Sequence, residues 1–237
     1  MDTAGFKRGA GAPPQDTLNT GNVNGKNWIP AECDVSIRPG WFYHKSEDSK
    51  VKTPEQLFDL YLKSVGRGAN LLLNVPPDRR GLINEKDSAA LVGFRKSMDN
   101  NFKSDLLKNE TINILTHNAI KGTERLNDDN DSTFEFMNFE YQSNSFLCAF
   151  KNEKKINTII LKEFLQMGQG IKKFRIVLVD TKGKKKEIVG TTIGRQTIIT
   201  FPTINTTYLG FEVLEDKGFS ILTEIKAYLI DERLVER

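Results

Sequence analysis

The sequence predicts an α/β unit followed by an all-β unit, and three observations support this division. Residues 34–102 alternate short apolar strands with amphipathic helices, which is the βαβα order of a parallel α/β fold. From about residue 108, short β-rich segments follow one another with turn signals at regular spacing, as in an antiparallel β-sandwich. The length of 237 residues allows one large domain or two ordinary ones. We therefore divide the chain into residues 1–105 and 106–237.

Composition excludes several functional classes. The formal net charge of +3 is too small for a nucleic-acid-binding surface. No apolar run approaches the length of a membrane span, so we expect no membrane partner. The N-terminal residues lack the apolar core of a signal peptide, as would a chain cut from a longer secreted precursor. The histidines His44 and His117 lack metal-ligand spacing, and Cys33 and Cys148 fall in different units, so we expect neither a metal site nor a disulfide.

The stretch from Trp28 to His44 is the richest in candidate site residues. Val35–Ile37 alternates like a short strand, and Pro39–Gly40 ends it because proline lacks an N–H group. Aromatic and charged side chains crowd around this break: Trp28, Glu32, Asp34, Arg38, Trp41, Phe42, Tyr43 and His44. Aromatic faces and charged hydrogen-bonding groups are what a sugar site needs. Aromatic clusters are also typical of cores, so both interpretations stay open.

Two helices follow, separated by a strand. Thr53 is placed to cap a helix that begins at Pro54, with Gln56 completing a capping box. The apolar run Ala69–Val75 is typical of a strand buried on both faces. Asn84 is placed to cap the second helix.

Several polar residues follow the ends of the two predicted strands. Arg38, Trp41 and His44 come after the first strand and Asn74 comes at the end of the second. In α/β barrels the catalytic groups lie at the carboxyl ends of the strands. Glu32 comes before the apolar pair of its strand, so its position at this edge is less certain.

Nine β-rich segments are predicted in the second unit. They are Ile112–Leu115, Thr133–Phe139, Ser145–Phe150, Ile156–Leu161, Phe174–Val179, Lys186–Val189, Gln196–Phe201, Tyr208–Val213 and Ile221–Tyr228. The basic run Lys182–Lys186 is predicted to be a solvated hairpin loop. This unit contains no tryptophan, which favours an accessory structural domain over a sugar-binding module.

Two motifs resemble those of a known family. Residues 30–44, PAECDVSIRPGWFYH, resemble a signature of family 29 glycoside hydrolases, the α-L-fucosidases, and Tyr61–Asp78 resembles the family's next barrel strand. The resemblance covers residues 24–105 closely. It implies the C-terminal portion of a (β/α)8-type barrel. Leu161–Phe174 is similar to the matching stretch of galactose-binding-like (discoidin-type) sandwiches, except that Gly170 stands where their pattern has arginine.

The resemblance implies a retaining glycoside hydrolase that removes terminal α-L-fucosyl groups from an oligosaccharide or glycoconjugate. It implies no metal or organic cofactor, and a periplasmic or secreted location. A (β/α)8 barrel takes roughly 250 residues, whereas about 105 precede the predicted sandwich. The family's nucleophile motif is absent, so we expect an N-terminal barrel segment to be missing. The alternative is a non-catalytic carbohydrate-binding or structural module left from a truncated fucosidase.

The resemblance also suggests roles for individual residues. Glu32 is the candidate acid/base, with substrate binding or loop support as the alternative; Asp34 does not match the nucleophile motif. Arg38 is a sugar ligand or a structural ion-pair partner. Trp41 would form a wall of the fucose pocket. His44 would contact a sugar hydroxyl or pack against its neighbours.

Overall fold

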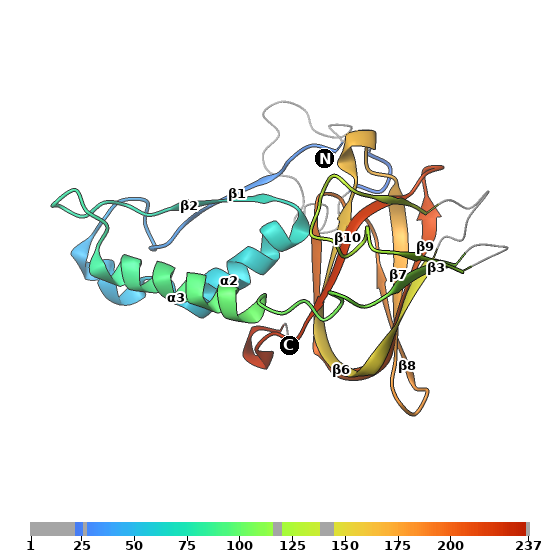
Figure 1. Ribbon diagram of the computed structural model, residues 1–237. Helices are drawn as coiled ribbons and strands as arrows, with labels where there is room; N and C mark the ends of the chain where they lie inside the picture. The colour runs from blue at the N-terminus through green and yellow to red at the C-terminus, as the bar shows by residue number, and fades with distance from the viewer. Residues whose placement is uncertain (1–21, 26–27, 116–119, 138–144, 236–237) are drawn as a thin grey trace.

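The computed structural model describes residues 22–25, 28–115, 120–137 and 145–235. It is mostly antiparallel sheet with few helices (Figure 1). The N-terminal unit contains β1 (Glu32–Ser36), the 3-10 turn η1 (Lys45–Lys50), α2 (Pro54–Lys63), the 3-10 turn η2 (Val65–Arg67), β2 (Asn70–Asn74) and α3 (Glu85–Asn101). These bounds confirm the predicted order of strands and helices in residues 34–102.

The two strands of the N-terminal unit are parallel and in register. Glu32 pairs with Asn70 at one end, and Ser36 pairs with Asn74 at the other. Helices α2 and α3 pack on one face of this pair around a small core centred on Ile37. In the described residues β1 and β2 pair only with each other, so this unit is a piece of a parallel sheet and not a closed barrel.

Local capping sets the starts of both helices, as the sequence predicts. The Thr53 hydroxyl accepts from the backbone N–H of Gln56, and the Gln56 side chain accepts from the N–H of Thr53. Asn84 caps α3 by accepting from the N–H of Lys86. These contacts satisfy N–H groups that have no partner inside the helix.

The C-terminal unit is an eight-stranded antiparallel sheet. Its strands are β3 (Ile112–Leu115), β4 (Ile120–Thr123), β5 (Glu135–Phe136), β6 (Ser145–Glu163), β7 (Ile171–Val179), β8 (Lys185–Gly190), β9 (Thr197–Asp216) and β10 (Ile221–Tyr228), with 3-10 turns η3 (Leu165–Met167) and η4 (Glu232–Leu234). The strand order is β4-β3-β6-β9-β7-β8, and β10 pairs with both β6 and β5. The sheet surrounds a large apolar core.

Four of the predicted β-segments are joined in pairs into two long strands. The sequence predicts them as four separate segments. Ser145–Phe150 and Ile156–Leu161 both lie in β6, and Gln196–Phe201 and Tyr208–Val213 both lie in β9. Register shifts between β6 and β9 allow the strands to bend without breaking the sheet. The first half of β6 pairs with β3 and the second half with β10. The eight strands therefore form one connected sheet that bends around its core, and this sheet-rich unit fits the predicted antiparallel β-sandwich.

Other predictions for this unit have mixed outcomes. The basic run lies at the predicted β7–β8 hairpin. Strand β4 was not predicted. The segment predicted at Thr133–Phe139 contributes only the short strand β5, and its last two residues lie outside the described part of the chain. The two cysteines that the sequence places in different units are both free thiols.

A third apolar core joins the two units. Phe58 of α2 stacks on Phe102 with ring centroids 5.7 Å apart, and Phe102 meets Tyr228 of β10 edge-on at 5.2 Å. Ile160 and Ile198 of the sheet complete this core. Within the described ranges, neither α2 nor α3 is long and apolar enough to cross a bilayer. The same ranges contain no group of three acidic, histidine or cysteine side chains suited to a metal ion.

Candidate active site

The face of β1 and β2 that lies away from the helices is mostly polar, with Leu72, opposite Asp34, as its exposed apolar residue. Asn70 donates from Nδ2 to Glu32 Oε2 at 3.4 Å, and Asn74 donates from Nδ2 to Ser36 Oγ at 3.1 Å. These contacts place Glu32, Asp34 and Ser36 on one face because alternate residues of a strand point the same way. The carboxylates of Glu32 and Asp34 are both exposed on this face.

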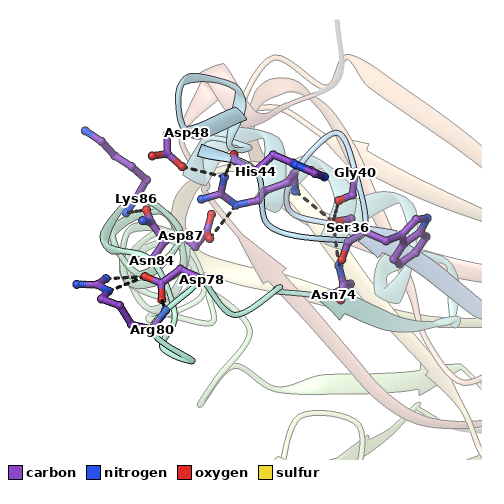
Figure 2. A network of polar contacts seen from close by, with 12 residues as sticks. Ser36, Gly40, His44, Asp48, Asn74, Asp78, Arg80, Asn84, Lys86 and Asp87 are labelled. Carbon is purple, nitrogen blue, oxygen red and sulfur yellow. Dashed lines mark hydrogen bonds and ion pairs between the residues drawn. The ribbon is translucent and has the colours of Figure 1, made fainter. Parts of the chain in front are cut away.

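Hydrogen bonds fold the loop after β1 back onto the strand ends. Ser36 donates its hydroxyl to the carbonyl of Gly40 at 2.7 Å and accepts from the backbone N–H of Arg38 at 3.3 Å. Asn74, at the end of β2, also donates to the carbonyl of Trp41 at 3.0 Å. Figure 2 shows Ser36, Gly40 and Asn74 meeting at this point. The loop carrying the predicted site residues is thus fixed by both strands.

Arg38 lies beneath this loop, with only 1% of its surface exposed. Its Nε donates to Asp87 Oδ2 at 3.0 Å, and its Nη1 donates to Asp48 Oδ1 at 2.9 Å and to the carbonyl of His44 at 3.3 Å (Figure 2). The ring of Tyr43 lies 4.7 Å from the guanidinium carbon. This arrangement favours the ion-pair alternative for Arg38.

The charge of Arg38 is retained despite its burial. Burial would lower the pKa of the guanidinium, but hydrogen bonds and charge attraction from Asp87 and Asp48 outweigh it and raise the pKa. Three polar atoms of this cluster are buried without a hydrogen-bond partner among the described residues: Arg38 Nη2, Glu47 Oε2 and Asp87 Oδ1. These three atoms could therefore make further hydrogen bonds next to the loop.

Two aromatic side chains of the loop face solvent, whereas Tyr43 packs against Arg38. Trp41 is 50% exposed and Phe42 is 78% exposed. The side chain of His44 is also exposed, although its carbonyl is held by Arg38. The loop is therefore not part of a buried aromatic core, and the indole of Trp41 is accessible to a ligand.

A second charged group lies in the loop after β2. Asp78 accepts from the backbone N–H of Arg80 at 2.8 Å and from its guanidinium at 2.9 and 2.6 Å. Arg80 also contacts Glu85 at 2.7 Å, at the start of α3. The hydrogen bonds from Arg80 lower the pKa of Asp78 and keep it charged. The group appears beside Asn84 in Figure 2.

The structure gathers some predicted residues and separates others. Arg38, Trp41 and His44 belong to one loop at the carboxyl end of β1. Glu32 is the first residue of β1, so it lies about 13 Å along the strand from Ser36. Trp28 lies apart from this loop. Its indole Nε1 lies next to Gly194 of the C-terminal unit, so close that a Cβ added at Gly194 would be 3.3 Å from it.

Sequence reasoning missed the residues that support the loops after β1 and β2. They are Ser36, Asp48, Asp78, Arg80 and Asp87. The one available signal was the position of Ser36, directly after the apolar strand residue Val35. Asp48 and Asp87 carry no comparable signal because their contact with Arg38 depends on the packing of η1 and α3.

The sequence is similar to known alpha-L-fucosidases. The family model "Alpha-L-fucosidase" matches residues 13–103. Alpha-L-fucosidase 1 of Arabidopsis thaliana is 35% identical over 190 residues, which cover 76% of this chain and 37% of the relative. A relative from Oryza sativa subsp. japonica, also described as an alpha-L-fucosidase 1, is 35% identical over 198 residues, which cover 81% of this chain and 38% of the relative.

Solved structures extend the similarity to both units. A GH29 fucosidase from Ruminococcus gnavus, solved with fucose, aligns with a TM-score of 0.79 at 26% identity, covering 91% of this chain and 44% of that one. A glycoside hydrolase 29 family member from an unknown rumen bacterium aligns with a TM-score of 0.74 at 30% identity, covering 94% of this chain and 37% of that one. The chain thus belongs to the alpha-L-fucosidase family and spans 37–38% of the length of the curated relatives that it matches.

Proposed function

We propose that the complete protein is a retaining α-L-fucosidase and that this chain supplies the C-terminal portion of its barrel, followed by a β-sandwich accessory domain. The observation that carries the proposal is the polar face of β1 and β2. In a (β/α)8 barrel the helices pack outside, so the helix-free face of each strand points into the barrel. Glu32 and Asn70 lie on that face and contact each other.

Glu32 is the proposed general acid/base. A retaining glycosidase needs a second carboxylate about 5–5.5 Å from the first, to act as nucleophile. We assign that nucleophile to the upstream part of the barrel, because Asp34 does not fit the family's nucleophile motif. The two carboxylates complete the reaction without a metal or organic cofactor.

The loop after β1 would form the wall of the sugar site farther from Glu32, which lies about 13 Å along the strand from Ser36. The exposed indole of Trp41 offers an apolar face to the C–H side of a fucose ring. His44 would hydrogen-bond a sugar hydroxyl. Arg38 would act from beneath, since its contacts with Asp48 and Asp87 hold the loop in place.

The proposed substrate is a fucosylated oligosaccharide or glycoconjugate, in keeping with the fucose complex of the Ruminococcus gnavus relative. No nucleic-acid or membrane partner is proposed. The remaining partner is an N-terminal barrel segment, because both strands of the parallel pair have an open edge in the described residues. Because the family resemblance implies export, we propose that the complete protein is located in the periplasm or outside the cell.

Hydrolysis of two α-L-fucosides by the chain extended with its upstream residues tests this proposal. We expect turnover of 4-nitrophenyl α-L-fucoside by the extended protein. Glu32→Gln should slow hydrolysis of a fucosylated trisaccharide by roughly 10²–10⁴-fold. It should slow the nitrophenyl fucoside less, because nitrophenolate leaves without a proton. Asp34→Asn, two residues away on the same face, is the matched control. Equal losses with both substrates, or equal losses in both variants, would contradict the role of Glu32.

The alternative is a non-catalytic carbohydrate-binding or structural module. The observation that favours it is the presence of only two barrel-type strands in the described residues. An extended protein that binds fucosylated glycan saturably but shows no turnover would support this alternative over the enzyme.

A further inference from the structure

The C-terminal unit contains a cavity of about 840 Å³ that is separate from the polar face of β1 and β2. It lies between the β3–β4 hairpin and the two loops that flank it in sequence. Six charged side chains form much of its wall: Lys108, Glu110, Lys121, Glu124, Arg125 and Asp128. This size is typical of small-molecule sites, but a polar lining is not typical of the apolar pockets that bind drug-like ligands.

A fixed carboxylate contributes to this cavity. Glu135 of β5 lines it and is only 7% exposed. Thr123 donates its hydroxyl to Glu135 Oε1 at 2.5 Å and accepts from the backbone N–H of Arg125 at 3.1 Å. The second contact fixes the direction in which the hydroxyl donates. Glu135 is therefore held in one orientation as a hydrogen-bond acceptor.

Other polar groups in the wall are also held by the fold. Asn127 donates from Nδ2 to the carbonyls of Leu107 and Glu110 at 2.7 and 3.0 Å. Asp128 accepts from the hydroxyl of Thr133 at 2.7 Å. Because these groups are already ordered, a ligand that meets them loses less affinity to the ordering of side chains.

The charges in the lining identify the class of ligand. Two of the lining charges are already paired with residues outside the lining, Lys108 with Asp129 at 2.8 Å and Glu110 with Lys154 at 3.4 Å. The remaining two cations are offset by three carboxylates, so neither an anion nor a cation is strongly favoured. Among the described residues, the lining includes no aromatic side chain that could stack on a sugar ring and no large aliphatic side chain, so recognition here would rest on hydroxyl groups alone. A neutral molecule with many hydroxyl groups can donate to the carboxylates and accept from Lys121 and Arg125.

We propose that this cavity is a second glycan site, which binds a neutral oligosaccharide through its hydroxyl groups. The choice of a glycan rests on the proposed function, whereas the neutral and hydroxyl-rich character rests on the cavity. Binding here requires no reaction at Glu32. The cavity would hold the glycan that surrounds a fucosyl group or a neighbouring glycan chain.

Titration of the ¹⁵N-labelled chain with lacto-N-tetraose, a neutral tetrasaccharide without fucose, tests the proposal. We expect saturable shifts at the amides of Gly122, Thr123 and Arg125, and none at Arg38 or Trp41. Glu135→Gln and Lys121→Ala should each weaken binding about fivefold, the loss expected for one hydrogen bond. Lys121 is exposed, so its variant keeps the test valid if Glu135→Gln does not fold.

Glu232→Gln, at an exposed position in η4, is the matched control and should bind like the parent. Absence of saturable shifts at the cavity amides, or unchanged affinity in Lys121→Ala, would overturn the proposal. Tighter binding of a sialylated analogue would overturn the neutral assignment. Because the probe carries no fucose, a negative titration would not contradict the proposed hydrolase activity. Absence of hydrolysis would likewise not contradict glycan binding in this cavity.

Discussion

The buried charge of Arg38 holds the loop after β1 in place without having to contact a substrate. Its guanidinium joins the loop after β1 to η1 through Asp48 and to α3 through Asp87. The sequence allowed an ion-pair role but could not name the partners. They lie 10 and 49 residues away and meet Arg38 only after the helices pack on the sheet.

Removing this guanidinium should destabilise the fold strongly. Arg38→Met leaves Asp87 buried without its partner, and breaking a buried pair typically costs about 3–5 kcal/mol in the free energy of unfolding. Urea unfolding measures this loss. Arg233→Met, which removes an exposed pair with Asp231, is the control and should have little effect. If both variants lose equal stability, the buried ion pairs do not hold the loop.

Glu163 is a second buried ionisable residue, and it should make the stability of the fold depend on pH. Its carboxylate is 5% exposed and accepts from the backbone N–H groups of Gly170, Ile171 and Gly194 at 2.9, 2.8 and 2.7 Å. Burial raises the pKa of Glu163 to about 7, although these N–H donors act in the opposite direction. The carboxylate thus joins the end of β6 to the start of β7 and to the turn before β9.

The raised pKa predicts lower stability at higher pH. Between the unfolded pKa of a glutamate, about 4.3, and the folded value of about 7, the folded state binds more protons than the unfolded state. The free energy of unfolding therefore falls as pH rises through this window. Urea unfolding at several pH values between about 5 and 8 measures the slope, which should be smaller in Glu163→Gln.

Glu224 should keep part of that slope in the variant, because burial raises its pKa to about 7 as well. Glu232→Gln, at an exposed position, should retain the parent slope. Stability that rises with pH across the same window in the parent would contradict the assignment.

At the scale of elements, the helices were predicted more accurately than the strands. The starts of α2 and α3 depend on contacts within three residues, so Thr53, Gln56 and Asn84 mark them directly in the sequence. Strands β6 and β9 each contain a polar middle section that looks like a turn. Their continuity depends on pairing with each other, which no local pattern records.

The same distinction applies to the candidate site. The order of residues along the chain was enough to place Arg38, Trp41 and His44 in one loop after a strand. The position of Glu32 required the actual start of β1, which lies three residues before the apolar alternation that suggested the strand. A strand that begins with exposed polar residues gives no hydrophobic signal at that end.

At the scale of the whole molecule, the two units share a core and should unfold together. The rings of Phe58, Phe102 and Tyr228 connect α2 to the sheet through the segment after α3. Both tryptophans, Trp28 and Trp41, precede α2 in the chain, whereas most of the strand content lies after residue 111. The Trp28 indole lies near Gly194 of the C-terminal unit, so it is replaced by phenylalanine for this test. In that Trp28→Phe background, fluorescence reports Trp41 of the N-terminal unit, whereas far-ultraviolet circular dichroism reports mainly the sheet.

Phe58→Ala tests whether this shared core couples the units. Phe58 is fully buried, so its truncation should lower the free energy of unfolding by about 3–5 kcal/mol. We expect the fluorescence and dichroism midpoints in urea to fall together, because the lost contacts belong to both units. Val92→Ala, at an exposed position on α3, is the control and should shift neither midpoint appreciably. If Phe58→Ala lowers only the fluorescence midpoint, the sheet is stable without the helices, and the interface orients the N-terminal unit without stabilising the C-terminal one.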